Sequence, residues 1–246
     1  MEARVFDRMY ACKDNHWWFV NHRLLVSRLI ERFSKPGAAC KILDAGCGPG
    51  VMLRKLREYG WTVGLDYSEL ALGYCLRDNG KPLCRGSVSS LPFKKNSFDF
   101  VIIADVLYHH NVRDDGLAMR EIYASLKDGG IAIFHEPAFE FLRRKHDVAE
   151  HTARRYTIRR LKRKAHDAGF RVVDTFYANN LIFVPVLFVK IAERFIDLWR
   201  GAGSDLIVVP PVINRMFTCL VKLETRVFSR LKLPFGVTVV CVASKG

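Results

Sequence analysis

The sequence lacks the features of a secreted, disulfide-bonded protein. Its seven cysteines form no C-x-x-C pair and show no paired spacing, which argues against a disulfide framework and against cysteine zinc ligands. Residues 1–13 mix charges without a continuous apolar core, so no secretory signal is predicted. We therefore expect a cytoplasmic protein whose thiols are reduced.

Long apolar runs, internal repeats and low-complexity linkers are absent as well. The apolar run at residues 181–189 contains Pro185 and is much shorter than the about 20 residues that span a bilayer. Hydrophobic residues make up 50% of the chain, enough for a sizeable core. We predict a single domain over residues 1–246, with an N-terminal helical lid at residues 1–35 and a helical cap inserted at residues 178–234.

What the sequence does contain is a glycine-rich turn within residues 41–50. A short apolar strand ends there, and glycines at every second position precede a helical pattern over residues 51–59. Glycines let the backbone bend tightly and let a ligand approach the main chain. A second strand ends at Asp66, twenty residues past Gly46, where an acid can accept the ribose hydroxyls of an adenosine. The pattern predicts an adenosine site at the ends of two strands.

These two segments, L-D-A-G-C-G-P-G at 43–50 and G-L-D-Y-S at 64–68, resemble the first two motifs of class I S-adenosylmethionine-dependent methyltransferases. Residues 86–93, 97–104 and 105–110 are similar to later motifs of the same family. Ser87 stands where the family has an acid that holds the adenine amino group. The resemblance therefore implies a weaker hydrogen bond from Ser87, with the backbone at Val88 carrying the contact.

The resemblance implies both a fold and a cofactor. The fold is a Rossmann-like α/β fold with helices on both faces of a seven-stranded, mostly parallel sheet, an antiparallel last strand and a helical insertion between strands six and seven. The cofactor is S-adenosylmethionine. Its implied ligands are Asp44, Gly46, Cys47, Gly48 and Gly50 around the methionine portion, Asp66 on the ribose, Tyr67, Ser87 and Val88 near adenine, and Ala104 beneath the sulfonium.

The segment after the expected fifth strand, residues 135–157, is the predicted substrate loop. Its P-A-F, H-D, H and R-R-Y-T residues resemble a bacterial subgroup of these enzymes that is associated with glycan or lipid biosynthesis. Methyl transfer requires alignment and exclusion of water, and a hydroxyl acceptor also needs a base, for which histidine has a suitable pKa. The predicted catalytic residues are His146, His151 and His109, and the predicted substrate-binding residues are Asp147, Arg155 and Tyr156.

Each of these assignments has an alternative. The polar loop residues could instead tie down a cationic loop, and His109 could anchor its own loop by hydrogen bonds. A metal site formed by Asp147 with the two loop histidines is weaker, because no third ligand at helical spacing is evident. We predict no metal.

Charge and apolar surface indicate the partner. The chain has a net charge of +14, and residues 140–164 hold ten Lys or Arg against three acids, a block that suits an anionic partner. Residues 181–199 read as an apolar helix with a narrow polar stripe, suited to a membrane interface, a lipid groove or a homodimer contact. Residues 211–231 read as a second amphipathic helix, expected to pack against the core with Ile213, Phe217, Leu220, Val227 and Leu231 on one side.

The sequence therefore predicts methyl transfer to a small-molecule, lipid-linked or glycan acceptor, in the cytoplasm or at the inner face of the membrane. One alternative is an RNA methyltransferase, but no N-P-P-Y or D-P-P-Y follows strand four and no Pro-Cys pair is present, so nucleic acid is not expected. The other is a non-catalytic scaffold of the same fold at a membrane surface. Residues 16–33 read as an amphipathic helix, and Trp17 and Trp18 are candidates for a lid over the cofactor, with ordinary packing as the alternative.

Overall fold

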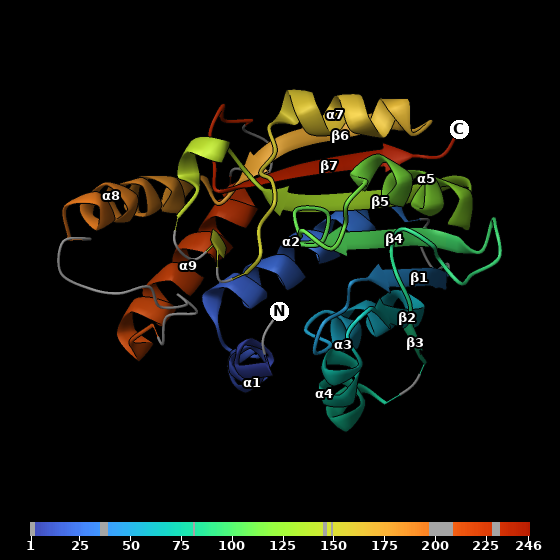
Figure 1. The fold of residues 1–246 in the computed structure, drawn as a ribbon, viewed down its shortest axis with the longest axis horizontal. Coiled ribbons are helices and arrows are strands. Elements are labelled where there is room, and N and C mark those ends of the chain that lie inside the picture. Colours follow the sequence, from blue (N-terminus) through green and yellow to red (C-terminus); the bar gives the residue numbers. More distant parts are fainter. Residues whose placement is uncertain are drawn as a thin grey trace.

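The computed structural model describes residues 3–34, 39–80, 82–144, 147–148, 150–196, 209–227 and 232–246. Within them the chain forms a seven-stranded sheet of order β3-β2-β1-β4-β5-β7-β6 (Figure 1). The strands are β1 (Cys40–Ala45), β2 (Gly60–Asp66), β3 (Leu83–Arg85), β4 (Phe98–Ala104), β5 (Leu126–Pro137), β6 (Arg171–Ala178) and β7 (Thr238–Ser244).

The sheet is mixed in the way the sequence predicts. Strands β1 to β5 pair in parallel, whereas β7 runs antiparallel to both β5 and β6. The strand order reverses between β1 and β4, and the crevice at that reversal is where an open parallel sheet binds its ligand. The predicted fold class is confirmed.

The helices are α1 (Ala3–Cys12), α2 (Trp17–Phe33), α3 (Leu53–Leu56), α4 (Glu69–Asn79), α5 (Asp115–Ser125), α7 (Ile158–Asp167), α8 (Asn180–Ile196) and α9 (Pro211–Val227), with short 3₁₀ turns η1 (Arg57–Tyr59) and η2 (Glu140–Leu142). Figure 1 shows α8 and α9 beyond the end of the sheet toward which the parallel strands point. These two helices therefore lie over the crevice edge.

The core lies on both faces of the sheet because alternate strand residues point to opposite sides. Leu43 and Val101 pack with α5 and α7 on one face, whereas Ile42 and Ile102 pack with α2 and α3 on the other. Strands buried on both sides need continuous apolar runs, which is why these segments contain so few polar residues.

Two boundaries differ from the sequence prediction. The helix expected over residues 51–59 is only α3 followed by the 3₁₀ turn η1. The K-D-G-G sequence at residues 127–130 predicts a helix C-cap, but α5 already ends at Ser125 and these glycines belong to β5. Gly129 has a φ of +74°, and its N–H donates to the carbonyl of Lys245, so it shapes an irregular strand edge instead.

The inserted helix α9 packs against α2 through polar and aromatic contacts and also contacts α8. The Trp17 N–H donates to Asn214, and the Trp17 ring meets Phe217 edge-on. Glu224, which is buried, accepts the first backbone N–H groups of α8 and so caps that helix. Of the side chains predicted to face the core, Phe217 and Leu220 are partly buried, whereas the prediction for Ile213 was wrong, because it is 40% exposed.

The predicted ends of the two inserted helices, Trp199 and Leu231, lie outside the described residues. No helix in the described ranges has the length and apolar character needed to cross a membrane.

Candidate functional site

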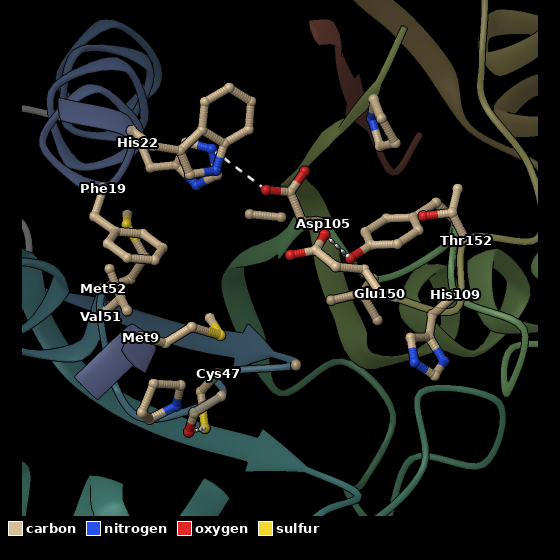
Figure 2. Close-up of a pocket in the computed structure, with 18 of the residues that line it drawn as sticks. Met9, Phe19, His22, Cys47, Val51, Met52, Asp105, His109, Glu150 and Thr152 are labelled. Atoms are coloured by element: carbon tan, nitrogen blue, oxygen red, sulfur yellow. Dashed lines mark hydrogen bonds and ion pairs between the residues drawn. The ribbon is translucent and has the colours of Figure 1, made fainter. Parts of the chain in front are cut away.

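A cavity of about 930 Å³ opens at the carboxyl ends of β1, β2 and β4. One end is formed by the glycine turn, and the far wall comes from α8 and α9 through Ile182, Val186 and Phe217. Ligand pockets commonly measure about 300–1,000 Å³, so this one is large. Figure 2 shows Cys47 and Met9 on one side of the cavity and His109 and Thr152 on another.

The glycine turn has a backbone that other residues would not readily adopt. Gly46 has a φ of +91°, and a Cβ at this position would lie 2.3 Å from the Val106 side chain. At Gly48, with a φ of +52°, a Cβ would meet nothing within 4 Å, because the position faces the open cavity. Gly50 does not line the cavity; with a φ of +83° it helps to form the turn.

Asp66 holds the turn in place from the end of β2. One carboxylate oxygen accepts the Gly48 N–H at 2.9 Å and the other accepts the Ser68 N–H at 2.8 Å. Each oxygen keeps a lone pair for a further donor. Burial raises the pKa of Asp66, although these backbone donors act in the opposite direction. The carboxylate is therefore fixed where two ribose hydroxyls can reach it.

Asp44 lies beside it, almost completely buried. Its Oδ2 atom has no hydrogen-bond partner among the residues that the structure describes. Burial, with a smaller contribution from the charge of Asp66, raises the pKa of Asp44 to about 7. A buried carboxylate without a donor is costly, and a cationic ligand group would satisfy it.

These residues fit S-adenosylmethionine. The cofactor has an ammonium group for Asp44, ribose hydroxyls for Asp66, and close approach to bare backbone at Gly48. Tyr67, Ser87, Val88 and Ala104 line the same cavity, as does Cys47, whose backbone N–H donates to Leu65. The Ser87 hydroxyl accepts the Ser89 N–H, so this replacement for the family's acid is engaged in its own turn.

The substrate loop is held by a buried ion pair. Arg155 donates to Asp147 from two nitrogens, at 2.7 and 2.9 Å, and also to the Ala138 carbonyl. Both residues line the cavity, but their charged groups are hydrogen-bonded to each other. Tyr156 was predicted to bind substrate, and the structure contradicts this: the side chain is fully buried, and its hydroxyl donates to Asp115 at 2.7 Å.

Replacing Arg155 with alanine is expected to lower the free energy of unfolding by about 3–5 kcal/mol, because it removes both charged hydrogen bonds that Arg155 makes to the buried Asp147 carboxylate. Arg120→Ala is the matched control: its pair with Asp114 spans 3.6 Å and is largely exposed, so the loss should be about 0–1 kcal/mol. Urea unfolding of both variants measures the difference. Equal losses would show that the Arg155 pair contributes no more than a surface pair.

The predicted catalytic histidines lie in different places. His109 lines the cavity, and its Nδ1 accepts the Asn111 N–H. The neutral ring therefore carries its proton on Nε2 and acts as a donor there. Burial, followed by neighbouring positive groups, lowers the pKa of His109 to about 4. His151 is exposed and does not line the cavity, and His146 lies outside the described residues.

The structure also brings residues to the cavity that the sequence did not indicate. His22, Trp18 and Asp105 line it, although only Trp18 was a candidate, for a lid. Glu136 accepts the backbone N–H groups of the three residues after Asp105 and fixes that loop. The acids and histidines themselves are visible in the sequence, but their spacing along the chain does not show which of them meet in the folded protein.

The comparisons with known proteins agree with this geometry. Residues 43–134 match the model of the methyltransferase domain family. The chain is 36% identical over 110 residues to malonyl-[acyl-carrier protein] O-methyltransferase of Erwinia pyrifoliae, covering 44% of this chain and 40% of that protein. It is 35% identical over 126 residues to demethylmenaquinone methyltransferase of Corynebacterium efficiens, covering 48% and 52%. The chain thus spans about half the length, or less, of these curated relatives.

The fold is shared more widely than the sequence. A solved S-adenosylmethionine-dependent methyltransferase from Thermotoga maritima superposes with a TM-score of 0.60 at 20% identity, covering 99% of this chain and 96% of that one. At that identity the likeness shows the fold. Residues 43–134, which include the glycine turn, Asp44 and Asp66, thus match a methyltransferase domain, and the residues that line the cavity fit S-adenosylmethionine as its cofactor.

Proposed function

We propose that the protein transfers a methyl group to a nucleophilic atom of a small, largely apolar and anionic acceptor, either free or lipid-linked. The observation that supports this most directly is the continuity of the cavity, which runs from the cofactor end at Gly48 and Asp66 to an apolar wall on α8 and α9. Donor and acceptor can therefore lie in one continuous cavity.

The acceptor end of the cavity is apolar. Its walls include Trp17, Phe217 and the α8 residues Ile182, Pro185, Val186 and Val189. Apolar walls bind apolar groups by removing both surfaces from water. The methyl acceptor therefore has a substantial hydrophobic part.

Cations also line the cavity. Arg113 and Arg144 line the cavity within or close to the basic block of the substrate loop. Guanidinium groups bind carboxylate and phosphate oxygens in paired hydrogen bonds. An acceptor with one apolar part and one anionic part complements both regions.

S-adenosylmethionine supplies a methyl group on a positively charged sulfur. The acceptor atom forms a bond to that carbon as the carbon–sulfur bond breaks, the electron pair goes to sulfur, and the acceptor's proton passes to water or a base. The chain contributes alignment and exclusion of water. Trp17 and Trp18 line the cavity from α2, which supports a role as a lid. His109 also lines the cavity with Nε2 as its donor, which supports a hydrogen bond from Nε2 to an acceptor oxygen.

The names of the curated relatives favour this acceptor class. One is named for demethylmenaquinone and one for malonyl-[acyl-carrier protein], so small or carrier-linked molecules are methylated by relatives of similar sequence. None of the three compared proteins is named for RNA. A loop histidine as general base stays a prediction, since only His109 among the described candidates lines the cavity.

The outer face of α8 supports a lipid-linked acceptor. Val184 is 65% exposed and Phe188 is 72% exposed, on the helix whose other residues line the cavity. Such a face suits shallow burial in a membrane interface. We propose peripheral membrane contact here, with a homodimer as the competing use, and sedimentation with anionic vesicles against light scattering would separate the two.

His109→Ala is expected to lower the rate of methyl transfer about tenfold, because one hydrogen bond to the acceptor contributes about 1–1.5 kcal/mol. Cofactor affinity should not change. His151→Ala is the matched control and should stay within about twofold of the original rate. A loss in His151→Ala equal to or greater than that in His109→Ala would restore the loop histidine as the base.

The deciding experiment incubates the protein with S-adenosylmethionine labelled in its methyl group and with fractionated cell extract. We expect label in a lipid or an anionic metabolite. Label in RNA would contradict the proposal, as would saturable cofactor binding with no transfer to any fraction, which would indicate a non-catalytic scaffold.

A further inference from the structure

Three side chains from separate elements meet at the edge of the cavity. His22 comes from α2, Asp105 follows β4, and His135 lies on β5, directly opposite Ala104 in the sheet register. One ligand atom from each lies within 4.8 Å of the other two. Figure 2 shows the Asp105 carboxylate turned toward His22.

The spacing is too long for hydrogen bonds. His22 Nε2 is 3.4 Å from one Asp105 oxygen, and His135 Nδ1 is 3.6 Å from the other. N–H···O hydrogen bonds are about 2.7–3.2 Å long. Among the residues that the structure describes, His22 Nε2 and both ring nitrogens of His135 are buried with no hydrogen-bond partner.

The two nitrogen–oxygen distances, which run to different oxygens of Asp105, are close to the separation of neighbouring ligands around a metal ion. Nitrogen and oxygen ligands lie about 2.0–2.2 Å from zinc, and at a tetrahedral angle they stand roughly 3.3–3.5 Å from each other. Two imidazoles and one carboxylate are also a common ligand set for divalent transition metals. One ion would engage nitrogens that otherwise have no partner.

From this geometry we propose that His22, Asp105 and His135 bind one divalent transition-metal ion, zinc in the first instance because methyl transfer involves no redox change. Both His22 and Asp105 line the cavity, and the Asp105 side chain is 25% exposed. The fourth coordination position therefore faces the cavity, as in zinc sites that bind a substrate or water. If the proposed function holds, that position takes an acceptor oxygen and lowers the pKa of its hydroxyl.

Surrounding residues hold the three ligands in place. The Trp18 ring lies 4.9 Å from the His22 ring. The Asp105 N–H donates to the His135 carbonyl at 2.8 Å. Asp105 itself has a φ of +57°, a backbone form that non-glycine residues seldom adopt and that aims its side chain between the two rings.

The test measures metal binding without any methyl acceptor. The full chain, stripped with a chelator and dialysed, is titrated with Co²⁺ and the visible absorption is recorded, followed by competition with Zn²⁺. We expect one equivalent to bind with the strong absorption of four-coordinate cobalt, and Zn²⁺ to displace it. His22→Ala and Asp105→Asn should weaken binding at least about 100-fold.

The control variant carries His110→Ala and His151→Ala together. These residues form a more exposed histidine group with His109, with ring centroids 4.9–5.9 Å apart, that could bind metal without selectivity. The control should bind cobalt like the unchanged protein. Loss of binding in the control, or no stoichiometric absorption in the unchanged protein, would overturn the proposal.

The outcome does not depend on the proposed function. Cobalt absorption of the unchanged protein needs neither turnover nor a correctly folded variant, and calorimetry with S-adenosylmethionine is run separately. Activity without metal binding would overturn only the metal site and would leave the cluster as a polar wall of the cavity. Metal binding without methyl transfer would overturn only the function.

Discussion

Replacing Asp66 with alanine is expected to weaken S-adenosylmethionine binding by at least about 100-fold. The carboxylate accepts the N–H groups of Gly48 and Ser68 and, in the complex, two ribose hydroxyls. Hydrogen bonds to a charged group contribute about 1.5–3 kcal/mol each, and about 1.4 kcal/mol corresponds to a factor of ten. The loss includes the disordering of the glycine turn that Asp66 holds.

Isothermal calorimetry measures this affinity directly. Glu69→Ala is the matched control, because Glu69 also lines the cavity but its carboxylate is exposed and paired with Arg85. It should bind the cofactor within about threefold of the unchanged protein. An Asp66→Ala variant that binds with nearly full affinity, while circular dichroism shows an intact fold, would remove the ribose assignment.

Asp44→Asn is expected to have opposite effects on stability and on cofactor binding. Since burial raises the pKa of Asp44 from its ordinary 3.8 to about 7, the unfolded chain loses this proton at a lower pH than the folded chain does. The free energy of unfolding therefore falls by about 1.4 kcal/mol per pH unit between these two values. Asparagine cannot ionise, so this loss is absent in the variant.

At pH 8 the cofactor-free variant should be about 2–4 kcal/mol more stable than the unchanged protein, and this advantage should disappear near pH 4. Cofactor binding at pH 8 should be weaker by about 10–100-fold, because a charged hydrogen bond to the ammonium group is lost. Urea unfolding at both pH values and calorimetry measure the two effects. A stability difference that does not change with pH would show that Asp44 is already ionised in the folded protein.

The affinity for the cofactor should rise with pH. Below pH 7 the Asp44 carboxyl is protonated in the free protein, and a cationic ligand must first displace that proton. The affinity of the unchanged protein should therefore rise by up to about tenfold per pH unit between pH 5.5 and 7. In Asp44→Asn this slope should be lost.

Much of the cofactor site could be predicted because its geometry is local. Gly46 and Gly48 are needed by a turn of a few residues, and Asp66 ends a strand that pairs with the strand before that turn. The alternation and length of apolar runs fixed the strands. These features depend on neighbours in sequence, so a short motif is enough to recognise them.

The substrate end was harder because its side chains find distant partners. Arg155 and Tyr156 looked like ligands on a polar loop, yet Asp147 and the remote Asp115 engage their polar groups. Nothing in the sequence distinguishes a polar side chain that meets substrate from one that meets another part of the chain. The choice is made by packing.

By itself the sequence determined the sheet, the glycine turn and the two acids that line the cavity beside that turn, since each follows from backbone conformation and strand periodicity within a short segment. Only the tertiary structure decided that His22, Asp105 and His135 lie together, that His151 lies outside the cavity and that α8 and α9 form its far wall. Contacts across more than a hundred residues depend on how helices dock on the sheet, and local patterns do not specify that docking.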